Sequence, residues 1–266
     1  MKKLLITCTT TSILAASAHA AVMLEQWNFD DSAGTGLANV SNTGSVGTAW
    51  NFNLAGQPGE GATDGTGNLV LEANTDAGSS TISSDYTRKA TFSSSVTTGA
   101  YTFEYSLSNW DLNDTAGADA IAGQEGFTLK IDDGAGNQIN LITALTGADN
   151  NVRVRHATNG TVSGTAAQST IGLSGSTLVV RVEGNLDDGT FTTSYDTGSG
   201  FNTLIADGTG LNSIGEIILS IEGDQGGWSS TDSMSVDYIQ LEAIPEPSST
   251  ALIGLASLGF ILRRRR

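Results

Sequence analysis

Hydrophobic and polar residues alternate along most of the central part of this chain. The clearest run covers residues 101–108, where Tyr101, Phe103, Tyr105 and Leu107 are separated by single polar residues. A period of two predicts strands that bury one face. The same period recurs at residues 50–54, 69–73, 127–131, 178–182, 191–195 and 217–221. Since no sustained 3.6-residue apolar period appears between them, we expect an all-β domain.

The segments between these runs carry the residues that tight turns require. Asp132-Asp133-Gly134, Asn159-Gly160 and Asp187-Asp188-Gly189 each supply residues that tolerate a positive φ. Residues 179–195 are therefore predicted to form a hairpin. Short strands at close intervals, without helical crossovers, favour an antiparallel β-sandwich or jelly roll. Residues 21–243 contain no proline after Pro58, so we expect them to form one domain.

The first twenty residues have the pattern of a secretion signal. Lys2 and Lys3 precede an apolar stretch that ends in Ala18-His19-Ala20, a small-residue cleavage site. The alternative is an uncleaved anchor. The apolar stretch is shorter than the roughly 20 residues that span a bilayer, and the cleavage site follows it directly. We therefore predict a signal peptide at residues 1–20, with Ala18 and Ala20 read by signal peptidase.

The last residues carry a second targeting pattern. Residues 248–262 have no charge, and they stand between a Pro-Glu-Pro triplet and an arginine cluster. Positive charge is retained at the cytoplasmic face, so the pattern predicts a short transmembrane helix within residues 244–266. A plain tail anchor is the alternative. The residues that define the pattern are Pro245, Glu246, Pro247, Arg263, Arg264, Arg265 and Arg266.

This tail resembles the PEP-CTERM sorting signal in all three of its ordered parts. The resemblance covers residues 244–266. It implies processing by an exosortase, a membrane enzyme that cuts near the Pro-Glu-Pro. It also implies a Gram-negative bacterium that makes extracellular polysaccharide, and delivery of the protein to the cell surface or the extracellular matrix. It does not bear on what residues 21–243 do.

Two segments near the ends of the predicted domain resemble the terminal strands of concanavalin A-like (LamG-like) sandwiches. They are Trp27-Asn28-Phe29-Asp30-Asp31 and Ser235-Val236-Asp237-Tyr238-Ile239-Gln240-Leu241. The resemblance implies that the first and last strands of the domain pair side by side.

Composition excludes several kinds of chemistry. The one cysteine, Cys8, lies inside the predicted signal, so the mature chain has no disulfide, zinc-thiolate site or cysteine nucleophile. The chain has a formal net charge of −16, and all 28 acidic residues lie between the signal and residue 248. Six of the 12 basic residues belong to the two targeting segments. The acidic remainder would repel phosphate backbones, so we expect no nucleic acid partner.

Two predicted loops combine tryptophan with oxygen-bearing side chains, as sugar-binding sites do. The candidate glycan-binding residues are Trp110, Asn113, Gln225 and Trp228. The first loop also offers Asp111, Asp114 and Asp119 as calcium ligands, because calcium binds six to eight oxygens. The alternatives are a solvated acidic surface and tryptophans that pack in the core, which we expect for Trp27 and Trp50.

Catalysis has weaker support in the sequence. The Glu-x-Asp-x-Glu signature of one concanavalin A-like glycosidase family does not occur, and Glu222-Gly223-Asp224 is the nearest approach to it. A polysaccharide lyase would have to use Arg153, Arg155 and His156. The leading hypothesis is a domain that binds glycan or matrix components without catalysis. A carbohydrate-active enzyme and a purely structural coat protein remain as alternatives.

Overall fold

The computed structural model describes nine segments of the chain: residues 21–44, 50–52, 61–72, 86–111, 127–146, 149–158, 161–171, 174–221 and 233–244. They belong to one compact unit, Ala21–Ile244. The predicted signal peptide and sorting tail lie outside these segments. Within the described segments, no helix is both long and apolar enough to cross a membrane.

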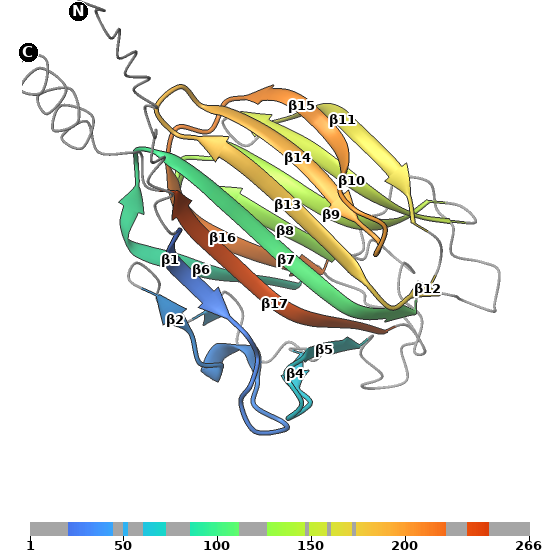
Figure 1. Ribbon diagram of the computed structural model, residues 1–266. Coiled ribbons are helices and arrows are strands. Elements are labelled where there is room, and N and C mark those ends of the chain that lie inside the picture. Colours follow the sequence, from blue (N-terminus) through green and yellow to red (C-terminus); the bar gives the residue numbers. More distant parts are fainter. Residues whose placement is uncertain are drawn as a thin grey trace, which may run out of the picture. The chain divides into compact units, whose positions relative to one another are not determined.

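The described strands form two antiparallel sheets (Figure 1). Sheet A has the strand order β15-β14-β13-β7-β17-β1-β2, with β4, β5 and β12 paired beside this path. Its strands are β1 (Val22–Trp27), β2 (Thr43–Gly44), β4 (Ala62–Thr63), β5 (Leu69–Glu72), β7 (Ala100–Asp111), β12 (Ser174–Gly175), β13 (Leu178–Asn185), β14 (Thr190–Asp196), β15 (Asn202–Thr209) and β17 (Ser233–Ile244).

Sheet B has the order β11-β10-β9-β8-β16-β6-β3. Its strands are β3 (Asn51–Phe52), β6 (Tyr86–Val96), β8 (Phe127–Asp132), β9 (Gln138–Thr146), β10 (Asp149–Thr158), β11 (Thr161–Thr170) and β16 (Ile214–Ile221). One short 3-10 helix, η1 (Leu37–Asn39), completes the described elements. The prediction of an all-β antiparallel sandwich is confirmed.

The hydrophobic core lies between the inner faces of the two sheets. Tyr105 of β7 meets Phe127 of β8 edge to face, with ring centroids 5.6 Å apart. Trp27 of β1 lies 4.9 Å from Trp50, next to β3. Both tryptophans are buried, as the sequence predicted. Each pair joins one sheet to the other, so aromatic contacts hold the two layers together.

Strand β7 is buried on both faces, whereas simple alternation predicts one buried face. Tyr101, Phe103 and Tyr105 face the core as expected, but Glu104 and Ser106 on the opposite face are also buried. The strand lies between β13 and β17, and long side chains from these neighbours cover its outer face. A period of two reports which residues share a face, and it does not report what neighbouring strands place over that face.

The first and last strands pair side by side, as the concanavalin A-like resemblance implied. Trp27 is in register with Ile239, and Val22 with Ala243. The expected first strand was nevertheless placed too late in the sequence. Strand β1 ends at Trp27, and Phe29 has a φ of 57°, a left-handed conformation that ends an extended run.

Turn chemistry is confirmed where the structure describes it. The hairpin predicted for residues 179–195 consists of β13 and β14. Gly189 closes it with a φ of 70°, and Gly134 has a φ of 83° in the turn between β8 and β9. Glycine adopts these positive values without the steric cost that a Cβ would bring. The turn expected at Asn159-Gly160 lies outside the described residues.

Candidate functional site

A row of polar residues crosses the outer face of sheet A, on the side opposite the core. Strand registry places Arg181 of β13 beside Glu104 of β7. It also places Glu104 beside Gln240 of β17, and Gln240 beside Gln26 of β1. Facing residues on neighbouring strands have Cβ atoms about 5 Å apart. Four strands therefore bring together side chains that are far apart in the sequence.

Glu104 is the centre of this row. Its side chain is buried, with 5% exposed. Arg181 donates from Nε to Oε2 over 2.5 Å. The Tyr238 hydroxyl donates to Oε1, and Gln240 donates to the same oxygen over 3.5 Å. A buried carboxylate is tolerated only with such partners, so the network fixes the positions of Arg181, Tyr238 and Gln240.

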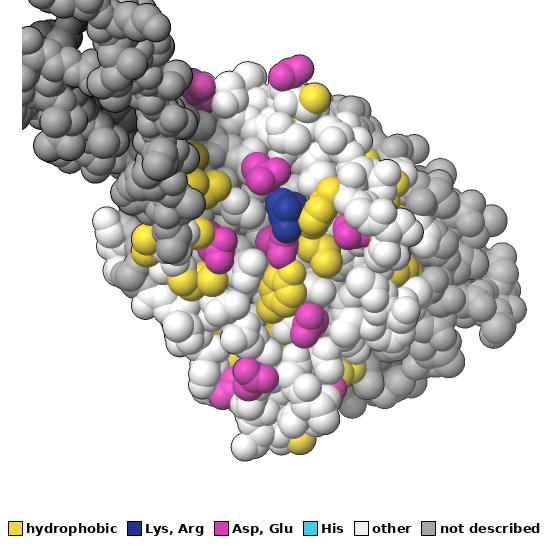
Figure 2. All heavy atoms as spheres, in the orientation of Figure 1, with side chains coloured by type: hydrophobic (Ala, Val, Ile, Leu, Met, Phe, Trp, Pro, Cys, Tyr) yellow, Lys and Arg dark blue, Asp and Glu magenta, His cyan; other side chains and the backbone are white. Residues whose placement is uncertain are grey.

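The network extends to both sides of Glu104. Gln26 donates from Nε2 to Oε1 of Gln240 over 3.2 Å. On the other side, the Arg181 guanidinium lies 3.9 Å above the ring of Phe201, which is 42% exposed. Figure 2 shows basic side-chain atoms near the middle of this face, with acidic and hydrophobic groups around them. The network therefore offers the guanidinium of Arg181, the amides of Gln26 and Gln240 and the exposed ring of Phe201.

Tyr238 acts as a hydrogen-bond donor in this network. Desolvation by burial raises the pKa of Tyr238, and the hydrogen bond to Glu104 raises it further. Its phenol therefore stays protonated throughout the physiological pH range and keeps donating to the carboxylate.

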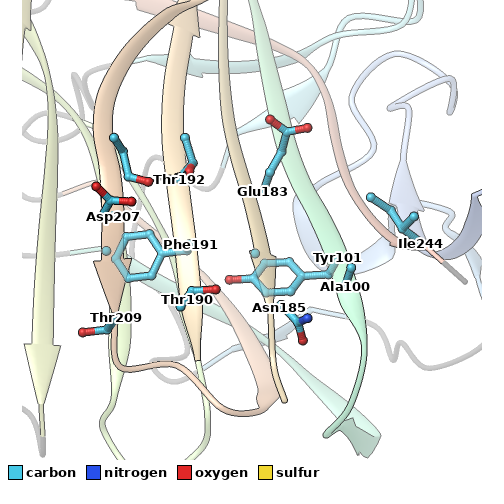
Figure 3. A pocket seen from close by; sticks show the side chains of 13 residues that line it. Ala100, Tyr101, Glu183, Asn185, Thr190, Phe191, Thr192, Asp207, Thr209 and Ile244 are labelled. Atoms are coloured by element: carbon cyan, nitrogen blue, oxygen red, sulfur yellow. Dashed lines mark hydrogen bonds between the residues drawn. The ribbon is translucent and has the colours of Figure 1, made fainter. Parts of the chain in front are cut away.

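A pocket of about 440 Å³ lies on the same face, at the end of sheet A where β7 begins and β17 ends. Ala100, Glu183 and Thr192 line it from the outer face, because side chains alternate along a strand. The core residues Tyr101 and Phe191 also line it. Figure 3 shows side chains from β13, β14 and β15 along its walls and Ile244 at its edge. The pocket and the Glu104 network share strand β13, where Glu183 follows Arg181 by two residues.

The polar groups around this pocket are hydroxyls, an amide and two carboxylates. They come from Asn185, Thr190, Thr192, Thr209, Glu183 and Asp207. Thr192 donates to the carbonyl of Ala206 over 2.9 Å and so connects β14 to β15. Glu183 and Asp207 are both exposed. Such a rim has many hydrogen-bonding groups and a negative charge.

Several aspartates outside the core have lowered pKa values for structural reasons. Asn68 and Thr66 hydrogen-bond to Asp64 and hold the pKa of Asp64 far below its usual value. Ser41 lowers the pKa of Asp31 in the same way, and Thr190 lowers that of Asp188. These carboxylates accept hydrogen bonds within local turns, as aspartate commonly does. Their shifts have the opposite sign to that of a catalytic acid.

Trp110 does not form the surface platform that the sequence suggested. Only 2% of its surface is exposed, and it belongs to the core cluster. Its ring lies over Gly175 of β12, where an added Cβ would come within 2.1 Å of Cζ2. The pairing of β7 with β17 shifts in register between Ser235 and Tyr238. The shift interrupts the alternation that begins at Tyr101 and turns Trp110 toward the interior, so the prediction for this residue is wrong.

The remaining predicted site residues are outside the described segments or lack a described side chain. Asp111 is the last residue of β7, in register with Ser174 and Ser233. Asn113, Asp114, Asp119, Gln225 and Trp228 all lie outside the described segments. Among the side chains that are described, no three histidine, cysteine or acidic groups lie close enough to hold a metal ion. The calcium and second-loop hypotheses stay predictions.

The residues considered for a lyase do not share one row of the sheet. Position 156 is in register with Ile139, whereas positions 153 and 155 are in register with Ile142 and Asn140. Ile139 is a core residue, so the backbone places position 156 on the core-facing side of β10. Positions 153 and 155 fall on the opposite side of the strand.

Sequence reasoning did not find the Glu104 network. Glu104 was recognised only as a polar position within the alternation of β7. Its partners come from β13 and β17, and their register depends on pairings over 77 and 136 residues of sequence. The available signal was a glutamate in the middle of the most clearly alternating strand, a position where a buried acid requires a partner.

The fold is similar to several solved carbohydrate-related structures. An endo-1,3-beta-glucanase from Streptomyces sioyaensis superposes with a TM-score of 0.52 at 11% identity, over 84% of this chain and 96% of that one. A xylan beta-1,4-xylosidase from Bacillus halodurans C-125 gives 0.51 at 10% identity, over 82% of this chain. This chain spans 38% of the xylosidase. A legume lectin-like domain from Entamoeba histolytica gives 0.42 at 9% identity, over 62% and 83%.

At these identities the likenesses concern the fold alone. No curated protein matches this chain significantly in sequence. One family match adds information of another kind, since residues 243–266 match the PEP-CTERM protein-sorting motif. The chain therefore has a concanavalin A-like β-sandwich and carries at its C-terminal end a PEP-CTERM motif, which marks an exported protein that is processed by an exosortase.

Proposed function

We propose that this chain is a surface or matrix protein of a Gram-negative bacterium, whose sandwich binds a neutral polysaccharide on the outer face of sheet A without catalysing a reaction. Signal peptidase and an exosortase are its processing partners. The segment within residues 244–266 holds the protein in the membrane during transit. The sorting motif at residues 243–266 supports the export part of this proposal.

The observation that carries the binding proposal is the polar row next to the pocket. Gln26, Gln240, Glu104 and Arg181 lie on four neighbouring strands and hydrogen-bond to one another. Planar amide, carboxylate and guanidinium groups match the hydroxyl groups of sugars, and an exposed ring matches their C–H faces. Because the network fixes these groups before any ligand arrives, little conformational entropy is lost on binding.

The charges around the pocket favour a neutral ligand over an anionic one. Glu183 and Asp207 both line the pocket and are exposed. Each would repel the carboxylate or sulfate of an acidic sugar. Hydroxyl groups, in contrast, can donate hydrogen bonds to these carboxylates. A neutral polysaccharide therefore fits the pocket rim better than a polyanion does.

The arrangement around Glu104 favours binding over hydrolysis. Glycoside hydrolysis requires one carboxyl group that gives up a proton and a second that attacks or activates water. Both oxygens of Glu104 already accept hydrogen bonds from its neighbours. The carboxylate therefore organises the surface and is not presented to a glycosidic bond.

Affinity electrophoresis of the purified, processed protein against soluble β-1,3-glucan, xylan and dextran would test this proposal. We expect retardation by at least one of these neutral polysaccharides. Arg181→Gln and the double variant Glu183→Ala/Asp207→Ala should weaken binding at least about tenfold, which is about 1.4 kcal/mol. Asp30→Ala is the matched control, because it removes an exposed acid that does not line this pocket.

Two outcomes would contradict the proposal. One is the absence of binding to any neutral polysaccharide by the folded protein. The other is a parent that binds while all the sheet A variants bind equally well. Reducing-sugar release by the parent protein would show that the domain is an enzyme.

A further inference from the structure

We propose that Phe201 is the stacking anchor for the polysaccharide on the outer face of sheet A, and that the ligand runs along strand β13 from Phe201 past Arg181 to the pocket. This inference rests on the proposed function. It adds the residue that contacts a sugar ring and the direction in which the chain lies, which could otherwise be across the strands.

The loop between β14 and β15 is fixed by one carboxylate. Asp196 Oδ1 accepts hydrogen bonds from three consecutive backbone N–H groups, those of residues 198–200, over 2.7, 2.9 and 2.9 Å. Asn202 closes the other side of the loop by donating from Nδ2 to the carbonyl of Gly200 over 3.1 Å. Phe201 stands between these contacts, so its backbone position is defined before any ligand binds.

The ring of Phe201 is held from below and open to solvent. The guanidinium of Arg181 lies 3.9 Å from the ring centroid, an arrangement in which the cation is attracted to the aromatic face. Arg181 is in turn held by the buried carboxylate of Glu104 over 2.5 Å. Since 42% of Phe201 remains exposed, the network presents a fixed aromatic surface to whatever lies on this face.

Large exposed hydrophobic side chains are few on the described surface. Among the described residues they are Val22, Phe201 and Ile244. Val22 and Ile244 stand at the start of β1 and the end of β17, beside the two targeting segments. Phe201 is the aromatic one, and it lies against the polar network. Aromatic rings of this kind pack against the C–H faces of sugars.

Strand registry places Phe201 and the pocket on opposite sides of Arg181. Arg181 pairs with Ser194, and Ser194 pairs with Thr203. Phe201 comes two residues before Thr203 in the sequence, whereas the pocket residues of β15, 206–209, come after it. Arg181 therefore lies between the aromatic ring and the pocket.

The groups that a ligand can reach follow the strands and not the row across them. The side chain of Arg181 is 30% exposed, but both of its neighbours in the row, Ser194 and Glu104, are buried. Along β13, in contrast, Arg181 is followed on the same face by Glu183, which is exposed and lines the pocket. Asp207 of β15 is also exposed there.

The path along β13 is longer than one sugar ring. Asp196, where the Phe201 loop begins, pairs with Val179, and Asn185 lines the pocket. From residue 179 to residue 185 the strand rises about 20 Å, at about 3.4 Å per residue. A ligand that contacts both ends is therefore an oligosaccharide or a longer chain, and its second contact forms intramolecularly once the first is made.

The first test compares variants of Phe201 by affinity electrophoresis of the processed protein in soluble β-1,3-glucan, xylan and dextran. Phe201→Ala should weaken binding of the polysaccharide that the parent binds by about tenfold, with little change in melting temperature because the ring is exposed. Phe201→Leu should also weaken binding, since it keeps an apolar group but loses the ring. Ser199→Ala is the matched control, because it truncates an exposed side chain of the same loop.

Phe201→Trp is the conservative variant and also a reporter. It keeps an aromatic face, so it should retain binding. The added indole should change its fluorescence when the polysaccharide is added, beyond any change that the parent shows. A spectral change of this kind follows from contact at the ring and not from a general effect on stability.

Asp196 is a positioning residue in this scheme, because it acts through Phe201. Asp196→Ala should weaken binding several-fold, and Asp196→Asn should restore much of it, since an amide oxygen still accepts hydrogen bonds. In a Phe201→Ala background, Asp196→Ala should weaken binding no further.

Chain length tests the direction. β-1,3-glucan, xylan and dextran oligosaccharides from the disaccharide to the hexasaccharide should bind the parent with rising affinity, until they reach both Phe201 and the pocket. In Phe201→Ala and in Glu183→Ala/Asp207→Ala this rise should level off at a shorter length, because only one end of the path remains.

The possible failures are distinguishable. If the parent binds no neutral polysaccharide, the proposed function itself is wrong and this inference is lost with it. If the parent binds but folded Phe201→Ala binds equally well, Phe201 is not the anchor, although the proposed function stands. If Phe201→Ala weakens binding and the pocket variants do not change its length dependence, the ligand does not run along β13.

Discussion

Val22 pairs with Ala243 in the antiparallel ladder between β1 and β17. Val22 is the second residue after the predicted signal cleavage site, and Ala243 is the first residue of the matched sorting motif. The two targeting segments are therefore attached to the same end of two neighbouring strands. Strand β1 begins at Val22 and β17 ends at Ile244, close in the sequence to the borders of these two segments.

The first prediction concerns the sorting tail. Changing Pro245, Glu246 and Pro247 to alanine, or deleting the four terminal arginines, should leave the protein exported but misplaced. The physical reason is that the charge cluster acts only after translocation has begun. Cell fractionation and the apparent size of the protein measure the outcome. Surface display and size identical to those of the parent would argue against a sorting function.

The second prediction concerns Trp110. Because the ring is buried, Trp110→Ala should lower the free energy of unfolding by about 3 to 5 kcal/mol, in the range of other buried aromatic truncations. Trp50→Ala should have a similar effect. Phe201→Ala is the control, since 42% of Phe201 is exposed. Urea unfolding curves give the values, and a small loss for Trp110→Ala would contradict the packing described above.

The third prediction concerns the coupling between Glu104 and Arg181. Glu104→Gln should destabilise the domain by about 1 to 3 kcal/mol, because it weakens a charge-assisted hydrogen bond to a carboxylate that is 5% exposed. In the double variant Glu104→Gln/Arg181→Gln the losses should not add. A double-mutant cycle measures the difference, and we expect a coupling of about 0.5 to 2 kcal/mol. Strict additivity would mean that the ion pair contributes nothing.

The fourth prediction concerns acid stability. Hydrogen bonds from Asn68 and Thr66 hold the pKa of Asp64 well below its usual value. The usual pKa of an unfolded aspartate is about 3.9, so the folded state prefers the charged form. The stability from Asp64 is therefore fully present above about pH 4, and it is lost as the pH falls further toward the folded-state pKa.

Asp64→Asn provides the comparison for this effect. The variant should be less stable than the parent at neutral pH, and the difference between the two proteins should shrink below about pH 4. Urea midpoints between pH 2 and pH 6 measure it. The same difference at every pH would mean that ionisation of Asp64 does not contribute to stability.

The sequence predicted the sandwich well because its strands depend on local information. Residues 101–107 alternate, and Gly189 stands where a tight turn needs a positive φ. Both signals lie within a few residues of the structure that they specify. The exact end of β1 was missed because the left-handed conformation of Phe29 has no counterpart in an aromatic residue's ordinary preferences.

The candidate sites were harder to predict because they depend on registry between distant strands. Trp110 comes just after the alternating run of residues 101–108, and nothing near it in the sequence reveals that Gly175 leaves room for its ring. Glu104 likewise appears as one polar residue among several until β13 and β17 place Arg181 and Gln240 beside it. Composition identified six basic residues, but only the sheet order shows that five of them share sheet B.

The last prediction concerns calcium at the first acidic loop. Asp111, Asp114 and Asp119 offer carboxylates at short intervals, and calcium takes six to eight oxygen ligands. If these residues form a site, calcium at a hundred times its dissociation constant should stabilise the fold by about 2.7 kcal/mol. Melting curves of the parent in calcium and in chelator measure this shift. Asp114→Asn/Asp119→Asn should abolish the shift, whereas Asp30→Asn, an exposed acid outside that loop, should retain it. Because magnesium is smaller and dehydrates reluctantly, it should give a weaker shift at the same concentration. Equal melting temperatures in calcium and in chelator would remove the metal hypothesis and leave the aspartates as a solvated surface.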